Sequence, residues 1–169
     1  MAKKPEIIVR QPFDSELDQV YLAGFDTWAG QKSREEYLIK LRTGAKYKQG
    51  TWWVAACDGK VASSMIVYKD AFGLPPETIG IGSVATPPAF RRNGYASQLI
   101  RDFLAMKPLE AVRAVFLFSE VKPEFYGKLG FVALPPELQK YPKSLCMVRC
   151  DPDYLDAIRS GLVEPPLYF

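Results

Sequence analysis

The segment TIGIGSVATPPAFRRNGYASQLI, residues 78–100, holds the residue types and spacing in this chain that are best suited to a chemical task. Within it, Arg91-x-x-Gly94-x-Ala96 stands where a predicted strand gives way to a helix. Gly94 lets the backbone approach a ligand closely, Ala96 leaves the first helical turn uncluttered, and the first N–H groups of a helix have no helical partner. Such a turn can bind a pyrophosphate, although an ordinary capped helix with arginines in solvent has the same pattern.

A second glycine pattern, Gly80-x-Gly82-x-x-Ala85, has the outline of a dinucleotide-binding fingerprint. That fingerprint functions only where its glycines form the turn between strand and helix, so that the helix N-terminus meets the pyrophosphate. Here the glycines lie inside the predicted strand, and Pro87-Pro88 separates them from the helix. We therefore expect these glycines to serve close packing or a bulge in the strand.

The chain contains no histidine. This excludes Ser-His-Asp and Cys-His nucleophilic machinery and leaves zinc poorly provided with ligands, so no metal is expected. Any catalysis has to use carboxylates, tyrosines, hydroxyls, backbone dipoles or a cofactor. The three cysteines are odd in number, and we expect them to be buried and reduced.

Hydrophobic patterns predict the elements that must position these residues. A strand is expected within 6–12, then a helix capped by Asp14 or Ser15, and a second helix from Ser33. Two apolar runs in 51–70 flank Asp58-Gly59 and predict a hairpin. The strand at 78–86 must stop at Pro87-Pro88, and the run at 91–106 is expected to be helical. Later elements are expected as a buried strand at 114–119, a short helix in 122–131 ended by Gly130, a strand from Phe131, a strand at 143–150 and a helix at 151–158 capped by Asp151.

Strands that pair early and are separated by helices later predict a mixed α+β fold. With 169 residues, 48% of them hydrophobic, the chain is expected to form a single domain over 1–169. A formal charge of +3 falls short of the basic footprint of a nucleic-acid binder. No stretch approaches the length of a membrane span, and the opening MAKK has no apolar region behind it. We expect a cytoplasmic protein without nucleic-acid or membrane partners.

The order of these motifs resembles that of the GNAT N-acetyltransferases. The first family motif, Q/R-x-x-G-x-G/A, is matched by Arg91, Gly94 and Ala96, and the second ends in a Tyr-x-x-x-Gly-Phe phrase, matched by Tyr126, Gly130 and Phe131. The resemblance is close over residues 78–133. It implies a mixed, mostly antiparallel central sheet with a splayed strand pair, flanked by helices.

The resemblance also implies acetyl-CoA as cosubstrate. The backbone of Val84, Ala85 and Thr86 is expected to pair with the pantetheine arm, and the N–H group of Val84 or Ala85 to face the thioester oxygen. The residues expected to form the turn that holds the pyrophosphate are Arg91, Arg92, Asn93, Gly94, Tyr95, Ala96 and Ser97.

Two side chains are the candidates for proton transfer. The resemblance implies that Tyr126 is the general acid near the sulfur, with packing of the short helix as the alternative. Glu120 is the best placed carboxylate for a general base, and Glu77 and a water on Ser83 are the next candidates. Some family members carry a glutamate on the strand that here reads Gly80 to Gly82, so this chain departs from that pattern. Glu120 is alternatively a solvated residue at the helix entry, with proton loss through water.

The implied reaction is transfer of an acetyl group to a primary amine by direct attack, with a small molecule or an amino acid as acceptor. A homodimer is compatible with the sequence. Family members commonly line the acceptor pocket from the first two helices and the last strands, which here offer Trp28, Tyr37, Trp52, Trp53 and Tyr141, each with core or surface packing as the alternative. The alternative function is a non-catalytic acyl-CoA-binding sensor or interaction module with the same fold.

Overall fold

The structure, a computed structural model, describes residues 5–106 and 109–169, and the basic opening of the chain lies outside these ranges. The chain divides into two compact units, the first made of residues up to 67 together with 83–105, the second of 68–82 and the residues from 106 onward. The strand order is β1-β2-β3-β4-β5-β7-β6. Strands β1 and β2, β5 and β7, and β6 and β7 pair antiparallel, whereas β4 pairs parallel with β5, which gives the mostly antiparallel α+β sheet expected from the sequence.

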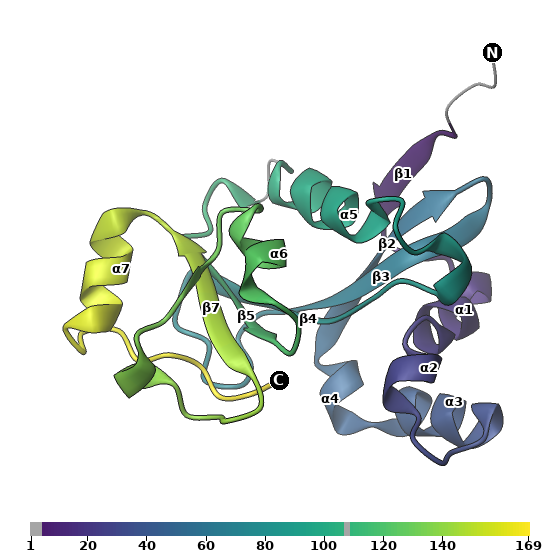
Figure 1. Ribbon diagram of the computed structural model, residues 1–169, viewed down its shortest axis with the longest axis horizontal. Coiled ribbons are helices and arrows are strands. Elements are labelled where there is room, and N and C mark those ends of the chain that lie inside the picture. The colour runs from purple at the N-terminus through teal and green to yellow at the C-terminus, as the bar shows by residue number, and fades with distance from the viewer. Residues whose placement is uncertain (1–4, 107–108) are drawn as a thin grey trace. The chain divides into compact units, whose positions relative to one another are not determined.

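The first unit begins with a strand and a group of short helices (Figure 1). Its elements are β1 (Ile7–Arg10), η1 (Asp14–Glu16), α1 (Leu17–Leu22), α2 (Phe25–Trp28), α3 (Arg34–Thr43), α4 (Ala45–Lys48), β2 (Gly50–Cys57), all of β3 (Lys60–Tyr68) except its last residue, the end of β4 (Thr78–Ala85), η2 (Pro88–Phe90) and α5 (Tyr95–Leu104).

Strand β2 is covered on both faces within this unit. Val54 packs with Val20 of α1 and Val61 of β3 in a buried cluster. The preceding residue, Trp53, points to the other face, where its ring meets Phe103 of α5 at a centroid distance of 5.0 Å. Alternating side chains on a strand therefore place α1 and α5 on opposite faces.

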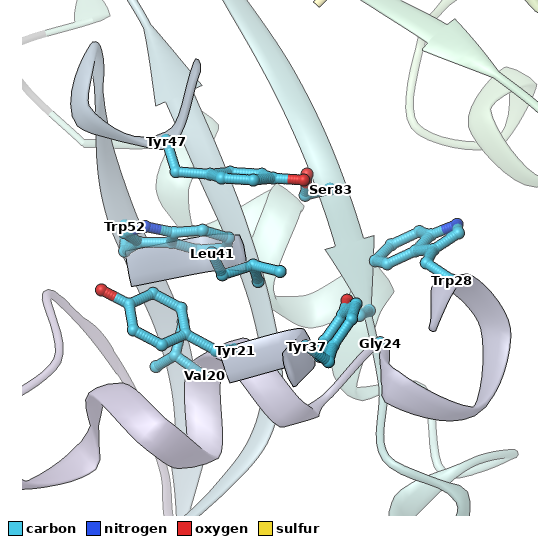
Figure 2. Close-up of a pocket in the computed structure, with 10 residues that line it drawn as sticks. Val20, Tyr21, Gly24, Trp28, Tyr37, Leu41, Tyr47, Trp52 and Ser83 are labelled. Carbon is cyan, nitrogen blue, oxygen red and sulfur yellow. The ribbon is translucent and has the colours of Figure 1, made fainter. Parts of the chain in front are cut away.

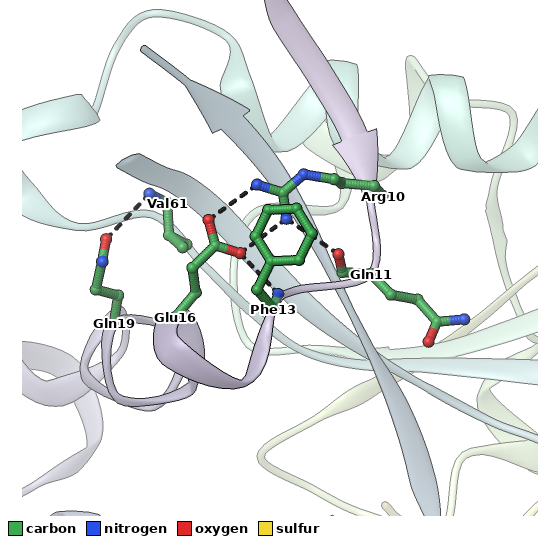
Figure 3. A network of polar contacts seen from close by, with 6 residues as sticks. All are labelled: Arg10, Gln11, Phe13, Glu16, Gln19 and Val61. Carbon is green, nitrogen blue, oxygen red and sulfur yellow. Dashed lines mark hydrogen bonds and ion pairs between the residues drawn. The ribbon is translucent and has the colours of Figure 1, made fainter. Parts of the chain in front are cut away.

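A compact ion-pair network joins β1 to η1 (Figure 3). The Arg10 guanidinium donates to both oxygens of Glu16, at 2.7 and 2.9 Å, and the N–H group of Phe13 donates to the same carboxylate at 2.8 Å. These bonds, the hydrogen bond from Arg10 first, hold the pKa of Glu16 below its usual value. The buried carboxylate fixes the entry into α1.

The second unit contains the start of β4, β5 (Ala114–Ser119), α6 (Pro123–Gly127), β6 (Val132–Ala133), η4 (Pro136–Leu138), β7 (Leu145–Cys150) and α7 (Pro152–Arg159). Strand β4 runs parallel to β5 over Thr78–Ile81, which pair with Ala114–Leu117. Strand β7 pairs antiparallel with all of β5. The parallel pairing thus covers only the first half of β4.

Most local signals of the sequence are confirmed. The Asp58-Gly59 pair has positive φ at both residues, as a primed hairpin turn requires. Ser33 caps α3 in a capping box with Glu36, and the Asp151 carboxylate accepts from the N–H group of Tyr154. Cys57 and Cys146 are buried and free, and burial raises the pKa of the Cys146 thiol to about 12.

Three helix predictions were wrong in detail. Asp14 and Ser15 lie inside η1 and do not cap α1, whose N-cap residue is Glu16. The first helix is interrupted at Ala23–Gly24, and the chain restarts as α2. Position 24 requires glycine because the Trp28 ring occupies the space that a Cβ atom there would fill. Helix α5 begins at Tyr95, four residues later than the predicted start, because Arg92 and Gly94 adopt positive φ angles. Within the described residues, no helix is long and apolar enough to cross a membrane.

Candidate functional site

The turn between β4 and α5 has an unusual backbone. Arg92 has φ of 63° and Gly94 has φ of 77°, so left-handed residues occur twice within three positions. A glycine adopts this region without cost, whereas arginine does so only where the surroundings hold it. Alternation of left-handed residues turns successive N–H groups toward a common concavity, which is the geometry of an anion-binding nest.

The N–H groups of this turn are available. Arg91 donates to the carbonyl of Pro88 at 3.3 Å, and Gln98 makes the first bond of α5, to the carbonyl of Gly94 at 2.9 Å. Among the described residues, none of the six N–H groups between them, from Arg92 to Ser97, donates a hydrogen bond to the protein. A helix N-terminus carries partial positive charge, so six unpaired donors at this point favour an anion.

The Arg91 side chain is occupied by the protein itself. Its Nε donates to the Thr86 carbonyl at 2.9 Å, and its guanidinium pairs with Asp26 at 2.8 Å. This arginine therefore ties the end of β4 to α2. Arg92, which is exposed, forms no ion pair with any described residue and is the freer cation of the two.

Neighbouring side chains brace the same turn. The Asn93 amide donates to the carbonyls of Phe90 and Arg91, at 3.2 and 2.9 Å. The Tyr95 hydroxyl lies 3.5 Å from the Cys57 sulfur on β2, and its ring contacts Phe90 edge to face. Asn93 and Tyr95 were predicted to contact the cosubstrate, and in the structure their side chains stabilise the turn whose backbone is free.

The end of β4 is held by a buried serine that the sequence did not reveal. Ser63 of β3 is fully buried, and its hydroxyl donates to the Ala85 carbonyl at 3.0 Å. The Thr86 hydroxyl lies 3.0 Å from the Ser63 hydroxyl oxygen. Because the single hydroxyl proton of Ser63 is already donated to Ala85, Thr86 is the donor in this second bond. Ser83 has φ of 48°, so β4 is distorted just before Val84. Residues 83–86 are thus fixed in an irregular conformation.

A pocket lined mainly by aromatic side chains adjoins this strand end (Figure 2). It contains about 220 Å³ of empty space, part of which is open to solvent. The lining residues, which come from α1 to α4, the segments next to them, β2 and β4, are Val20, Tyr21, Gly24, Trp28, Tyr37, Leu41, Tyr47, Trp52, Ser83 and Ala85. Trp28, Tyr37 and Trp52 were candidates from the sequence. Tyr21 and Tyr47 were missed because both read as ordinary helix residues.

The two other predicted acceptor residues have ring contacts of their own. Trp53 packs on Phe103, as described above, and does not line this pocket. Tyr141 belongs to the second unit, where its ring contacts Phe118 and Tyr168 at 5.5 and 5.6 Å. Both follow the packing alternative.

Tyr126 lies in α6 of the second unit and is 7% exposed. Its ring contacts Phe125 and Phe131 edge to face, at 4.9 and 6.0 Å. Burial raises the pKa of the Tyr126 hydroxyl to about 12, and the hydroxyl makes no hydrogen bond with the described residues. The phenol is therefore protonated at neutral pH and has a proton available for donation.

Glu120 follows β5 and is exposed. Its Oε1 accepts from the Tyr168 hydroxyl at 3.1 Å and from the Ser144 hydroxyl at 3.4 Å. The carboxylate is therefore positioned by two hydroxyl donors, unlike a side chain that points into bulk solvent. Glu77 has φ of 60°, and its carbonyl accepts from the N–H group of Arg113, so its backbone serves a turn.

Gly80 has a structural explanation. A Cβ atom at this position would lie 2.5 Å from the Phe169 ring, and Phe169 is buried among Tyr68, Phe72 and Phe118. The close-packing interpretation of Gly80 is confirmed, and the dinucleotide alternative loses its first glycine. No cluster of three or more metal-ligating side chains occurs in the described part of the chain.

Comparison with known proteins agrees with this geometry. A family model described as the GNAT acetyltransferase domain matches residues 9–133. A GNAT-family N-acetyltransferase from Escherichia coli, solved with CoA, is 19% identical, with a TM-score of 0.68 over 92% of this chain and 88% of that one. A GNAT-family acetyltransferase from Brucella melitensis, solved with acetyl-CoA, is 23% identical, with a TM-score of 0.58 over 83% and 86%.

A third structure is the N-acetylglutamate synthase of Neisseria gonorrhoeae, solved with CoA and N-acetylglutamate. It is 16% identical, with a TM-score of 0.56 over 88% of this chain and 36% of that one. A comparison with curated proteins gave no significant match. At these identities the structures establish the fold, whereas the family model covers well over half of the sequence. The chain belongs to the GNAT acetyltransferase family.

Proposed function

We propose that the protein is an acetyl-CoA-dependent N-acetyltransferase and that the turn Arg92–Ser97 binds the pyrophosphate of acetyl-CoA. The observation that carries this proposal is the run of six unpaired N–H groups from Arg92 to Ser97, which leads into α5 and contains left-handed residues at 92 and 94. Backbone donors at a helix N-terminus suit a pyrophosphate because they combine hydrogen bonds with a favourable dipole. The exposed guanidinium of Arg92 adds charge, and the Ser97 hydroxyl adds a donor.

The strand end Val84–Thr86 seats the pantetheine arm. The β4–β5 pairing covers only Thr78–Ile81, and the later residues of β4 are fixed by Ser63 instead. Strand-like backbone of this kind can pair with the amide groups of an extended ligand. The N–H group of Val84 or Ala85 faces the thioester oxygen and stabilises the charge that develops on it.

The reaction is a direct displacement. The amine nitrogen forms a bond to the acetyl carbon, the C–S bond breaks, the nitrogen loses a proton, and the CoA sulfur gains one. Tyr126 supplies the proton to sulfur. Complete transfer from a phenol of pKa about 12 to a thiolate whose thiol has a reference pKa near 8.5 is uphill by roughly 5 kcal/mol. Tyr126 therefore acts first as a hydrogen-bond donor to the charge that grows on sulfur. Because full transfer is uphill, we expect the proton to move only late in C–S bond cleavage, in the same step.

The proton that leaves the amine goes to Glu120 or to water. The two hydroxyls that hold the Glu120 carboxylate support a defined position for a base. The acceptor is a small-molecule amine or an amino acid.

The test combines binding with turnover. Acetyl-CoA should raise the melting temperature whereas NADH should not, and an amine panel should release CoA. Binding without release for any amine would favour the non-catalytic acyl-CoA-binding alternative. Arg92→Ala should weaken acetyl-CoA binding about two- to fivefold at low ionic strength and less in 0.5 M salt, because the removed charge is exposed.

Arg101→Ala is the matched control for Arg92→Ala. Arg101 is an exposed arginine in the last turn of α5, about 9 Å along the helix from its first residue. The two variants are compared at physiological ionic strength, where the Debye length is about 8 Å. The control should bind acetyl-CoA like the wild type. Equal weakening by both substitutions would show a general charge effect and would argue against a pyrophosphate at the turn.

A further inference from the structure

The lining of the aromatic pocket carries no charged side chain. Five of its ten residues are aromatic, and the remainder are Val20, Gly24, Leu41, Ser83 and Ala85. Burial raises the pKa of Tyr37 to about 12 and also raises the pKa values of Tyr21 and Tyr47. All three tyrosines are therefore neutral at physiological pH. The polar side-chain groups of the lining residues are the hydroxyls of the tyrosines and Ser83 and the indole N–H groups of Trp28 and Trp52.

The charges nearest to the pocket already have partners. Asp18, which acts electrostatically on Tyr21, forms a bidentate pair with Arg42 at 2.6 and 2.7 Å. Asp26, which acts on Tyr37, is paired with Arg91. The Lys46 ammonium lies 5.7 Å from the centre of the Tyr47 ring and is not a lining residue. The guanidinium groups of Arg42 and Arg91 are therefore already engaged within the protein.

The rings form flat walls. Tyr47 and Trp52 are stacked at 6.2 Å with 25° between their planes, and Tyr21 meets Trp52 edge to face at 5.8 Å. Figure 2 shows the Trp28 ring across the pocket from this stack, with Ser83 between the two sides. Ser83 and Ala85 flank Val84, so the pocket reaches the strand end proposed to seat the thioester.

We infer that this pocket holds the body of the acceptor and that the acceptor is a primary amine on an aromatic or other flat apolar body, without a carboxylate. The inference rests on the proposed function and selects between its two acceptor classes. Flat walls favour a planar body by offset and edge-to-face contacts. A carboxylate buried here would lose its hydration without a cationic partner, so an amino acid is disfavoured.

The same uncharged lining helps the amine to react. An ammonium that leaves water for a site without a carboxylate has its pKa lowered, because desolvation disfavours the charged form. More of the bound acceptor is then the neutral amine, which is the nucleophile.

The decisive experiment uses matched pairs that differ only in the carboxylate. With acetyl-CoA saturating, kcat/KM is measured from CoA release for phenethylamine against phenylalanine, tyramine against tyrosine and tryptamine against tryptophan. Each amine should exceed its amino acid by at least about tenfold, and butylamine should be poorer than phenethylamine. Amino acids used as well as or better than the amines would overturn the inference and leave the proposed function standing. If no member of the panel releases CoA, the proposed function fails as well.

A second arm tests the pocket itself. Trp28 is 38% exposed, so its removal costs little packing, and Trp28→Ala should raise the KM for phenethylamine at least fivefold with the KM for acetyl-CoA unchanged. Phe13→Ala is the control, because Phe13 is an exposed aromatic residue of the same unit outside the pocket, and both KM values should stay as in the wild type. An unchanged phenethylamine KM in Trp28→Ala, or an equal rise in both KM values, would overturn the inference.

Discussion

Replacement of Gly94 by glutamate is the sharpest test of the pyrophosphate turn. Gly94 has φ of 77°, and a Cβ atom built on it would meet no atom within 4 Å. The substitution therefore does not clash with the protein. It costs left-handed strain of about 1–2 kcal/mol, and it puts a carboxylate where six N–H groups are unpaired.

The matched control is Gly59→Glu. Gly59 has φ of 73°, is exposed, and likewise has no atom within 4 Å of an added Cβ, so strain and added charge are the same. For a chain of this size each kcal/mol corresponds to about 2–4 °C, so both variants should melt about 2–8 °C below the wild type without ligand.

The two variants should separate when acetyl-CoA is added. At one hundred times its Kd, the ligand stabilises the wild type by about 2.7 kcal/mol, which corresponds to a rise of about 5–11 °C. Gly59→Glu should keep this rise and Gly94→Glu should lose it, as measured by thermal shift or calorimetry. If Gly94→Glu retained the rise in full, the pyrophosphate would have to bind elsewhere and the reasoning from the free N–H groups would be refuted.

Three further predictions concern other parts of the chain. Tyr126→Phe keeps the buried ring and removes the proton, so kcat should fall about 10²- to 10⁴-fold with acetyl-CoA affinity and melting temperature unchanged, and a loss below about threefold would leave only a packing role. Gly80→Ala should lower the free energy of unfolding by about 1–3 kcal/mol through overlap with the Phe169 ring. In a double-mutant cycle, Gly80→Ala should cost much less in the Phe169→Ala background than in the wild type, and an equal cost in both backgrounds would contradict the overlap. The hydrogen bond from Arg10 lowers the pKa of Glu16, so the unfolded state binds more protons than the folded state in the acid range. The difference in unfolding free energy between wild type and Glu16→Gln, measured by urea titration, should therefore be complete above about pH 4.3 and should shrink as pH falls through the folded pKa. A difference that is constant with pH would contradict this linkage.

Local chemistry explains which features could be predicted from the sequence. The Asp58-Gly59 turn, the Ser33 and Asp151 caps and the stop of β4 at Pro87-Pro88 each depend on residues within a few positions of one another. The turn Arg92–Ser97, which we propose as the pyrophosphate site, belongs to the same class as a backbone feature, since its glycine and the start of a helix are neighbours in the chain. These signals need no knowledge of the tertiary structure.

The features that were missed depend on partners distant in sequence. The pairing of the Arg91 guanidinium with Asp26, 65 positions away, could not be read from the sequence, and the binding of Arg91 to the cosubstrate stays a prediction. Ser63 supports Ala85 from 22 positions away, and no pattern around Ser63 marks it. The aromatic pocket gathers residues from four short helices, β2 and β4, and each aromatic residue alone is indistinguishable from core packing.

The end of β4 joins these observations, because residues 83–86 serve three structures at once. Ser83 and Ala85 line the aromatic pocket, the Thr86 carbonyl receives Arg91 from the pyrophosphate turn, and Ser63 fixes the Ala85 carbonyl and the Thr86 hydroxyl. A strand with positive φ at Ser83 is held in place by those bonds, since such a conformation persists only where the surroundings determine it. The pairing with β5 covers only Thr78–Ile81, so Val84 and Ala85 lie beyond it, and under the proposed function their backbone faces the ligand. Under the proposed function, the acceptor pocket and the pyrophosphate turn are therefore set in register by one rigid segment, which is why a reaction without a covalent intermediate can rely on positioning.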